Sequence, residues 1–461
     1  MSMFEDARAL LSTGPLCHAC LGRVFADRSF GLTNVERGKA LRVAVAMDDD
    51  EPYDPPEPDA CWVCEGESLR AEAWAQGVVE ALEGVDFETY QVGTRVPPLI
   101  EENDALLREE AGLDPDAGES WKGDFNREVG KRVGAMTDTE VDFERPDVLA
   151  LLNVERARAG AEGPDREGDG SANADADHSI PPGAVDVQIN PAFVYGRYRK
   201  LERDVPQTEW PCRECGGSGK QFGDDGEEPC EHCDGTGYLY PTSVEEEVAP
   251  RVRDAMDGTE ALFHGAGRED VDALMLGTGR PFVVEVKEPT RRSPDVDALE
   301  ERINDESDVV EVVGLRLATH EMVERVKELD ASKTYWMEVA FDDAVDADAL
   351  EAALAELAGT TVEQYTPQRV DHRRANLTRE RTVYAISGEL EDDTHATVEV
   401  HGEGGLYVKE LVSGDEGRTE PSLAGLLDVG AEVTALDVVA VEGEDEPFDD
   451  PEYLREAEAD D

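Results

Sequence analysis

The sequence predicts a protein of mixed α and β structure that contains more than one domain. Its 461 residues are enough for two to four domains with sizeable cores. In the first half, helical spacing over 68–82 precedes a strand pattern over 87–96, and helical spacing over 119–133 precedes a short apolar strand over 148–154. A helix over 243–256 then precedes alternating strand and helix patterns that continue to about residue 441. This mixture indicates α/β architecture in both halves.

The chain is very acidic, with 108 Asp and Glu against 43 Lys and Arg, and a formal net charge of −65. Such a protein binds cations or basic partners, or it works in concentrated salt, where a dense carboxylate surface keeps it hydrated. The even spread of acid and the presence of only nine lysines favour the second explanation. At about 1 M salt the screening length is about 3 Å, so the net charge does not exclude a polyanionic ligand. Local basic patches then matter more than the total.

No targeting segment is apparent in the sequence. The first residues, Met1–Asp6, are acidic and lack a basic segment followed by an apolar one. Apolar runs also fall short of the length of a membrane span. We therefore expect a soluble, cytoplasmic protein.

The eight cysteines form four C-x-x-C pairs, which predict two zinc sites. Two thiolates on a tight knuckle hold one side of a tetrahedral ion, and a second knuckle completes the site. Disulfides are the alternative, but a cytoplasmic location disfavours them. Because each set supplies four sulfurs, the predicted metals are structural. The two sets are Cys17, Cys20, Cys61 and Cys64, and Cys212, Cys215, Cys230 and Cys233.

The second cysteine set has a competing interpretation. Residues 212–219 and 230–237 are two copies of C-x-x-C-x-G-x-G. This repeat resembles the cysteine-rich module of the Hsp40 co-chaperones. That module has four copies, however, and this chain also lacks an obvious J-domain His-Pro-Asp. A single zinc knuckle pair is the favoured interpretation.

A glycine-framed loop over 265–275 is the leading candidate for a catalytic segment. It presents Arg268, Glu269 and Asp270, and we expect a strand over 273–276, a turn over 277–279 and a second strand over 281–286 after it. A carboxylate beside an arginine on such a loop is a known way to keep an acid ionised within a pocket. The alternative is an aspartate that only caps a turn.

Three later segments could complete a site around this loop. The expected strand 333–339 places Tyr335 and Met337 on one face, where core packing is the alternative role for Tyr335. The segment 364–381 carries five arginines and one histidine, a composition that suits phosphate in so acidic a chain. The segment 404–422 carries Tyr407, Lys409 and Arg418, and Lys409 could pair with Asp270.

Together these motifs resemble the archaeal and eukaryotic family of tRNA pseudouridine synthases that act on uridines 54 and 55 of the T-loop. The resemblance implies a pseudouridine synthase core, in which helices flank a mixed, mostly antiparallel sheet with the active cleft across its middle. It also implies an α/β, THUMP-like accessory domain with zinc knuckles. The motifs that carry it are the first cysteine knuckles, Asn126–Lys131, Val194–Lys200, Gly265–Asp270, Arg369–Arg374 and Tyr407–Thr419.

The chain departs from the family pattern in three places. The segment 159–183 and the 14-residue gap between Cys215 and Cys230 look like insertions. In addition, Asp272 is followed by Ala-Leu where the family usually has Val-Arg. The last departure affects a minor basic contact and leaves the expected chemistry intact.

The resemblance also implies roles for individual residues. Asp270 is the expected catalytic group, and Lys409 is the cation that pairs with it. Tyr335 is expected to stack on the target uracil, with Tyr407 and Leu411 in the same pocket. No organic cofactor, catalytic metal or protein partner is implied; the partner is the T-arm of tRNA. The expected RNA-binding residues are Arg268, Arg369, His372, Arg373, Arg374, Arg379, Arg381 and Arg418.

A noncatalytic tRNA-binding protein or RNA chaperone on the same scaffold remains the alternative function. The joint presence of Asp270, Tyr335 and Lys409 favours the enzyme. The expected domains are a zinc module over 1–75, a THUMP-like domain over 76–190 with a disordered acidic loop over 159–183, a basic and zinc-knuckle segment over 191–243, a catalytic domain over 244–445 and an acidic tail over 446–461.

Overall fold

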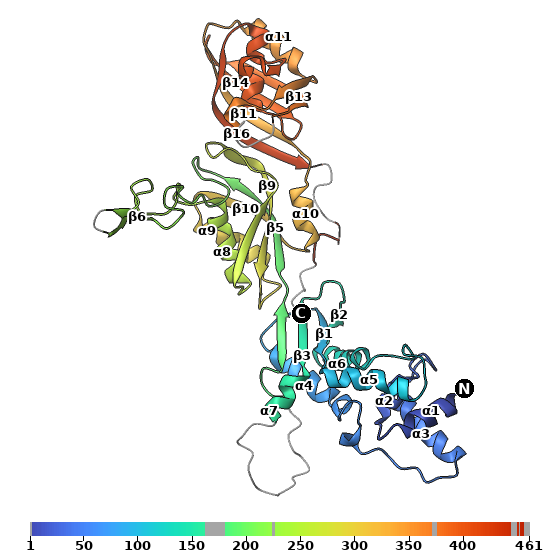
Figure 1. Ribbon diagram of the computed structural model, residues 1–461. Helices are drawn as coiled ribbons and strands as arrows, with labels where there is room; N and C mark the ends of the chain where they lie inside the picture. Colours follow the sequence, from blue (N-terminus) through green and yellow to red (C-terminus); the bar gives the residue numbers. More distant parts are fainter. Residues whose placement is uncertain are drawn as a thin grey trace. The chain divides into compact units, whose positions relative to one another are not determined.

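The computed structural model describes residues 2–161, 180–223, 226–370, 376–443, 450 and 452–455. These residues form two compact units, Met1–Asn190 and Pro191–Asp461 (Figure 1). Helices and strands are mixed in both units, as the sequence predicts. No helix in the described ranges is long and apolar enough to cross a membrane.

The first unit packs helices against a small sheet. Helices α4 and α6 bury Trp74, Val78, Phe125 and Val129 in one core with the sheet. Within the described residues the sheet has the order β2-β1-β3-β4, with β1 parallel to both of its neighbours and β4 antiparallel to β3. The helices are α1 Met3–Ser12, α2 His18–Arg23, α3 Asn34–Asp48, α4 Ala71–Ala81, α5 Pro98–Glu110, α6 Trp121–Thr137 and α7 Val154–Ala161, with short 3-10 turns η1 Pro58–Ala60 and η2 Glu67–Leu69. The strands are β1 Thr89–Arg95, β2 Glu140–Val141, β3 Val148–Asn153 and β4 Val185–Ile189.

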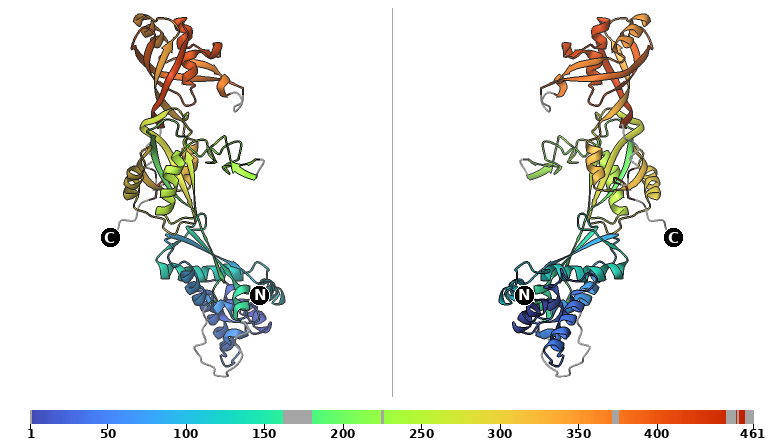
Figure 2. Two further views of the ribbon diagram at one scale, coloured as in Figure 1. Left: turned by 90° about the vertical axis from the view of Figure 1, so that its left-hand side faces the viewer. Right: turned by 90° about the vertical axis from the view of Figure 1, so that its right-hand side faces the viewer.

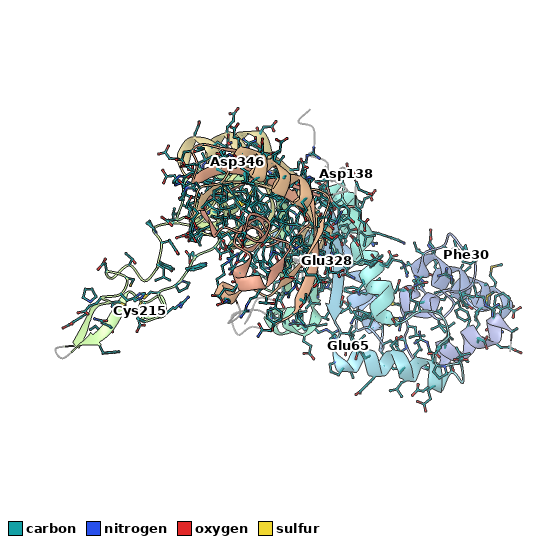
Figure 3. The ribbon with its side chains drawn as sticks, turned by 90° about the horizontal axis from the view of Figure 1, so that it is seen from above. Phe30, Glu65, Asp138, Cys215, Glu328 and Asp346 are labelled. Carbon is teal, nitrogen blue, oxygen red and sulfur yellow. The ribbon has the colours of Figure 1, made fainter. Side chains whose placement is uncertain are left out.

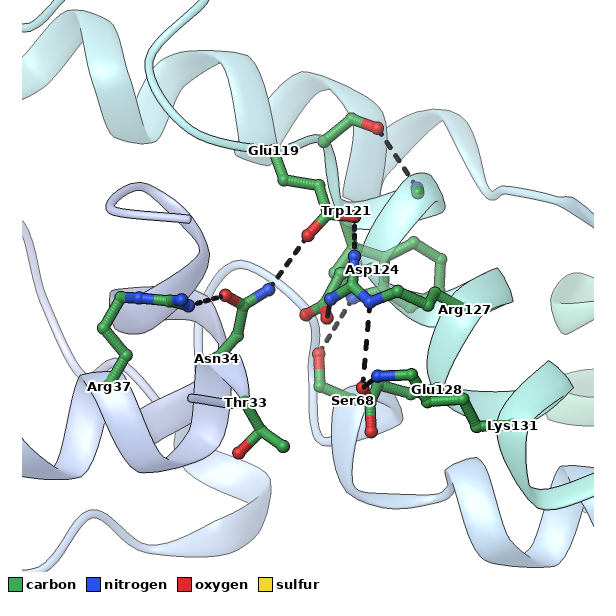
Figure 4. A network of polar contacts seen from close by, with 12 residues as sticks. Thr33, Asn34, Arg37, Ser68, Glu119, Trp121, Asp124, Arg127, Glu128 and Lys131 are labelled. Carbon is green, nitrogen blue, oxygen red and sulfur yellow. Dashed lines mark hydrogen bonds and ion pairs between the residues drawn. The ribbon is translucent and has the colours of Figure 1, made fainter. Parts of the chain in front are cut away.

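A polar network joins α3 to α6 in this unit (Figure 4). Asn34 is buried; its amide nitrogen donates to Glu119 at 3.1 Å and its amide oxygen accepts from Arg37. Arg127 is held by Glu119 and, at 2.8 Å, by Asp124. Arg127 of the segment 126–131 therefore takes part in an internal network that links α6 to α3.

The second unit is built on a large mixed sheet, which confirms the predicted fold class. Within the described residues the strand order is β10-β5-β9-β16-β11-β14-β13-β12-β15, and β8 pairs with β9. The pairing of β16 with β9 is parallel, and the other pairings are antiparallel. The strands are β5 Ala192–Lys200, β8 Glu260–Gly265, β9 Leu274–Lys287, β10 Val310–Ala318, β11 Ala331–Phe341, β12 Thr361–Tyr365, β13 Thr378–Leu390, β14 His395–Gly402, β15 Thr419–Glu420 and β16 Ala431–Gly443.

Helices pack on both faces of the part of this sheet formed by β10, β5 and β9 (Figure 2). Successive side chains of a strand point to opposite faces of the sheet. On one face Val194 and Phe282 pack with α8 and α9. On the other face Phe193 and Val283 pack with α10. A third core joins α11, α12 and α13 to β11, β13 and β14. The helices are α8 Val244–Ala255, α9 Val296–Glu306, α10 Glu321–Lys327, α11 Ala347–Leu357, α12 Val408–Ser413 and α13 Leu423–Leu427, with 3-10 turns η3 Gln368–Val370 and η4 Asp415–Gly417.

The predicted turn between two strands after the candidate loop was wrong, because residues 274–287 form one strand, β9. Gly277 and Gly279 have φ values of +54° and +73°, and the pairing of β5 with β9 shifts register beside them. A Cβ on Gly277 would lie 1.8 Å from the carbonyl oxygen of Val439. Glycine therefore lets the backbone bulge next to β16 without leaving the sheet.

The structure describes part of two predicted boundary segments. Helix α7 continues through Ala161, so it covers the first residues of the expected acidic loop; residues 162–179 lie outside the described ranges. In the expected acidic tail, Leu454 forms a β-bridge with Ala318, and the amide of Thr319 donates to the carbonyl of Tyr453 at 2.9 Å. The end of the described chain thus packs on the second unit.

Candidate active site

A cavity of about 550 Å³ lies over the middle of the large sheet, where β9, β16 and β11 adjoin. Its walls come from the loop between β8 and β9, from β9 and β11, and from the turn that leads into α12. The register pairs Tyr335 of β11 with Val438 of β16, and Val438 with Met275 of β9. The cavity is lined by Arg268, Glu269, Asp270, Ala273, Arg280, Lys333, Tyr335, Arg369, Gly405, Leu406, Tyr407, Val408, Lys409, Leu436 and Val438.

Asp270 presents its carboxylate to this cavity between two cations. The Lys409 ammonium lies 3.2 Å from Asp270 Oδ2, and Arg369 Nη1 lies 3.5 Å from the same oxygen. Lys409 is also 3.4 Å from Asp272 Oδ2. The side chain of Asp270 is 40% exposed, so a bound molecule can reach it.

Arg369 is anchored by a second, buried acid. Its Nε and Nη2 lie 2.7 and 3.3 Å from the two carboxylate oxygens of Glu410, whose side chain is nearly buried. The guanidinium is thus shared between Asp270 and Glu410. His372, Arg373 and Arg374, which follow Arg369 in the expected RNA-binding segment, lie outside the described residues.

Two tyrosines line the cavity as the sequence suggests. Burial raises the pKa of Tyr335 to about 12, so its hydroxyl stays protonated at neutral pH. The buried amide of Gln364 accepts from the backbone N–H of Tyr407 and donates to its carbonyl, both at 2.9 Å. The Tyr407 hydroxyl is buried and has no hydrogen-bond partner among the described residues.

The remaining predicted site residues are divided between the cavity and its surroundings. Arg268 lines the cavity. Leu411 is fully buried in the core beneath α12 and is not among the lining side chains. Three arginines lie beyond the lining: Arg379 donates to the Thr366 hydroxyl at 3.0 Å, Arg381 to Glu403 at 3.2 Å, and the Arg418 guanidinium lies 5.5 Å from the centre of the Tyr365 ring.

Three cations at or near the cavity were not predicted as site residues: Lys333, Arg280 and Lys200. Lys333 and Arg280 line the cavity, and Lys200 lies beneath the loop that carries Asp270. The sequence did contain a signal for two of them. Lys200 and Lys333 are two of only nine lysines in a chain whose other cations are arginines, so each lysine is a candidate for a specific role. Buried Arg280 lies in an apolar strand and has no comparable local signal.

The eight cysteines form two clusters that can each hold a metal ion. Within each cluster the four Sγ atoms lie within 4.8 Å of one another. Cys17 and Cys64 are 3.8 Å apart at sulfur, as are Cys215 and Cys233, and Cys212 and Cys230 are 3.9 Å apart. A tetrahedral ion with bonds of about 2.3 Å to sulfur has sulfurs about 3.8 Å apart. The donor sets therefore fit zinc, and the cysteines are free of disulfides.

The second cluster lies in a segment that extends from the sheet of its unit (Figure 3). There β6 Lys220–Gly223 pairs antiparallel with β7 Gly226–Pro229. Backbone N–H groups turn toward the sulfurs, as the N–H of Gly237 does at 3.2 Å from Cys233 Sγ. His232 Nδ1 lies 3.4 Å from Cys212 Sγ, next to a ligand set that is already complete.

Comparison with known proteins places the chain in a family. The family described as "Pus10, C-terminal" matches residues 193–442, and "Pus10 THUMP domain, archaeal" matches residues 74–153. A protein named tRNA pseudouridine synthase Pus10 from Halorubrum lacusprofundi is 63% identical over 99% of this chain and 100% of its own length. Its namesake from Methanothrix thermoacetophila is 39% identical over 96% of this chain and 95% of its own length.

Similarity to solved structures is weaker. A chain from the crystal structure of a Cbf5-Nop10-Gar1 complex matches with a TM-score of 0.28 and 20% identity, over 44% of this chain and 46% of that one.

The family matches and the full-length relatives confirm the resemblance noted in the sequence. The chain belongs to the Pus10 family.

Proposed function

We propose that this protein isomerises uridine to pseudouridine in tRNA and that Asp270 is its catalytic carboxylate. The main support is the placement of Asp270, which faces a cavity between Lys409 at 3.2 Å and Arg369 at 3.5 Å. The name tRNA pseudouridine synthase, carried by relatives that span the chain, supports the same activity. Asp270, Tyr335 and Lys409 all line one cavity, which favours the enzyme over a noncatalytic binding protein.

The reaction moves the sugar from one atom of uracil to another. The bond between C1′ and N1 breaks, the uracil turns, and C5 bonds to C1′; C5 loses a proton and N1 gains one, so the product is an isomer. In this scheme Asp270 attacks the sugar or base as a nucleophile, or it removes the 2′ proton to give a glycal and later returns it. Both routes require an unprotonated carboxylate close to the nucleoside.

The cavity suits one nucleotide that has been turned out of its stack. Its volume of about 550 Å³ is in the usual range for small-ligand sites. Tyr335 offers an aromatic face for the uracil. Tyr407 adds a second aromatic side chain to the lining. Arg268 and Lys333 supply cations at the walls, where the RNA backbone would pass.

We further propose that the substrate uridines are positions 54 and 55 and that the T-arm is the bound part of the tRNA. This proposal rests on the sequence motifs shared with the family that modifies these positions. The expected contacts with the folded RNA are Arg268 and Arg369 at the cavity and Arg379, Arg381 and Arg418 around it, together with residues 372–374. Such contacts would read shape and phosphate, because structured RNA presents few base edges.

The decisive experiment compares Asp270→Ala with the wild type on unmodified tRNA transcripts in high salt. We expect the variant to bind tRNA with unchanged affinity and to form no pseudouridine at positions 54 or 55, as mapped with carbodiimide. Asp343→Asn, which changes an exposed aspartate away from the cavity, is the matched control and should behave as wild type. Pseudouridine formed by Asp270→Ala would refute the catalytic assignment, and an inactive wild type would favour the binding-only alternative.

We also propose that both cysteine clusters hold structural Zn²⁺. The sulfur spacings of 3.8 to 3.9 Å support a tetrahedral ion. Four thiolates fill each site, so the metal would stabilise local folding and would not contact the substrate.

A further inference from the structure

The loop that carries Asp270 rests on a buried lysine at the end of β5. The Lys200 side chain is fully buried, and its ammonium lies 2.9 Å from the carbonyl oxygen of Val205, 2.9 Å from that of Val271 and 3.3 Å from that of Asp270. An ammonium has three N–H donors, and three carbonyls surround this one. Lys200 therefore binds the main chain of Asp270 itself and of the next residue.

Arg203 extends this support by one residue. Its Nη1 donates to the carbonyl of Asp272 at 2.8 Å, and it pairs with Asp437 at 2.8 Å. Asp437 in turn accepts from the backbone N–H of Leu274 at 3.1 Å. The carbonyls of three consecutive residues, 270 to 272, are thus held by two cations from a single segment.

The residue before Asp270 also anchors the loop, through a buried carboxylate in the lining of the cavity. Glu269 is almost completely buried, and its carboxylate is 2.8 Å from Arg280 Nε and 3.9 Å from Lys200 Nζ. Burial, followed by the charge of Glu269, raises the pKa of Tyr198 well above its usual value, so the Tyr198 hydroxyl keeps its proton and donates to Glu269 at 2.9 Å. Both acids line the cavity, but Glu269 is fixed by buried partners, whereas Asp270 is 40% exposed and can be reached by a bound molecule.

We infer that Lys200 and Arg203 are positioning residues, which hold the backbone of 270–272 so that the Asp270 carboxylate meets the substrate in the reactive geometry. This inference rests on the proposed role of Asp270. Neither cation is among the residues that line the cavity, so they act through the loop and not on the RNA. A misplacement of about 1 Å at a reacting group can cost about 100-fold in rate, which is enough to make this support measurable.

Removal of the ammonium should loosen the loop without unfolding the protein. The Asp270 and Val271 carbonyls each keep a backbone partner, because the N–H of Ala273 donates to the first at 3.1 Å and that of Asp204 to the second at 3.0 Å. Lys200→Met preserves most of the side-chain length in the buried space. Burial also lowers the pKa of Lys200, so a neutral replacement removes a charge whose burial is already unfavourable.

The test measures single-turnover pseudouridine formation at increasing enzyme concentration, together with amide hydrogen exchange. For Lys200→Met we expect the maximal rate to fall at least tenfold, with less than a twofold change in the half-saturating concentration. Amides of 266–273 should exchange at least tenfold faster, while those of β11 stay unchanged. Arg203→Met should show the same pattern with a smaller loss, because this side chain is 40% exposed and holds only the Asp272 carbonyl of the loop.

Arg199→Met is the matched control. Arg199 is the neighbour of Lys200 on β5, and it donates to the carbonyl of Gly277, outside the loop, and pairs with Glu311. It should keep the wild-type rate and loop exchange. If Lys200→Met fails to fold, Arg203→Met decides: a rate at least threefold lower with unchanged half-saturation supports the inference, and a wild-type rate overturns it.

Two other results would also overturn the inference. One is a Lys200→Met rate within twofold of wild type. The other is a raised half-saturating concentration with an unchanged maximal rate, which would make Lys200 an RNA-binding determinant. Failure of the proposed function would look different, because the wild type itself would then form no pseudouridine.

Discussion

The Lys409 ammonium, in the lining of the cavity, lies 3.2 Å from the Asp270 carboxylate. Asp270 comes from the segment between β8 and β9, and Lys409 from the start of α12. The two residues meet over the large sheet. In its strand order, β16 and β11 lie between β9, which follows the Asp270 loop, and β14, which precedes α12. The pair is therefore a product of the completed fold.

Replacing Lys409 by methionine should slow catalysis. Within the part of the chain that the structure describes, Asp270 would keep Arg369 as its ion-pair partner. We expect single-turnover pseudouridine formation to fall about tenfold or more, equivalent to about 1.4 kcal/mol. Lys409→Arg should recover part of the loss because it restores a cation. Lys327→Met, at an exposed lysine of α10, is the control. A Lys409→Met rate within twofold of the wild type would contradict this role.

The pair of Arg369 and Glu410 should contribute to stability. Arg369→Met would leave the nearly buried Glu410 carboxylate without its partner, and we expect a loss of about 1–2 kcal/mol in the free energy of unfolding, reduced because Arg369 is itself 40% exposed. Adding Glu410→Gln should restore most of the loss. Denaturant unfolding of both single variants and the double variant measures the coupling. Additive single effects would show that the two side chains act independently.

Tyr335 should give the protein a component of stability that depends on alkaline pH. Its folded-state pKa of about 12 exceeds the usual value of 10.0, so its contribution is complete below pH 10 and is lost as the pH rises toward 12. Relative to Tyr335→Phe, the wild type should lose about 2–3 kcal/mol of unfolding free energy across this window. Denaturant titrations at several pH values test this, and parallel curves for the two proteins would disprove the shift.

Metal analysis should find two zinc ions per chain. Cys20→Ser and Cys233→Ser should each lower the stoichiometry by one, because each removes one of four sulfurs from a different cluster. Each variant should also melt at a lower temperature than the wild type. A wild-type value near one would show that one of the clusters does not retain metal.

The sequence alone was sufficient for the features that depend on neighbouring residues. Paired cysteines with knuckle spacing predicted both thiolate clusters, and apolar spacing predicted α6 and β11. Gly265 and Gly267, which precede Arg268 and Asp270, marked the loop that lines the cavity. These signals are local, because turns, knuckles and the two helical and strand periods are set by residues a few positions apart.

Only the tertiary structure decided what depends on contacts between distant segments. It showed that Gly277 and Gly279 bulge a continuous strand, because β16 passes against the backbone of Gly277 and β5 against that of Gly279. It also placed Leu411 in the core and put Lys200 beneath the Asp270 loop, where a buried ammonium is stable only because carbonyls and Glu269 surround it. A single sequence lists these partners but does not specify which of them meet, since their contacts exist only after the sheet has assembled.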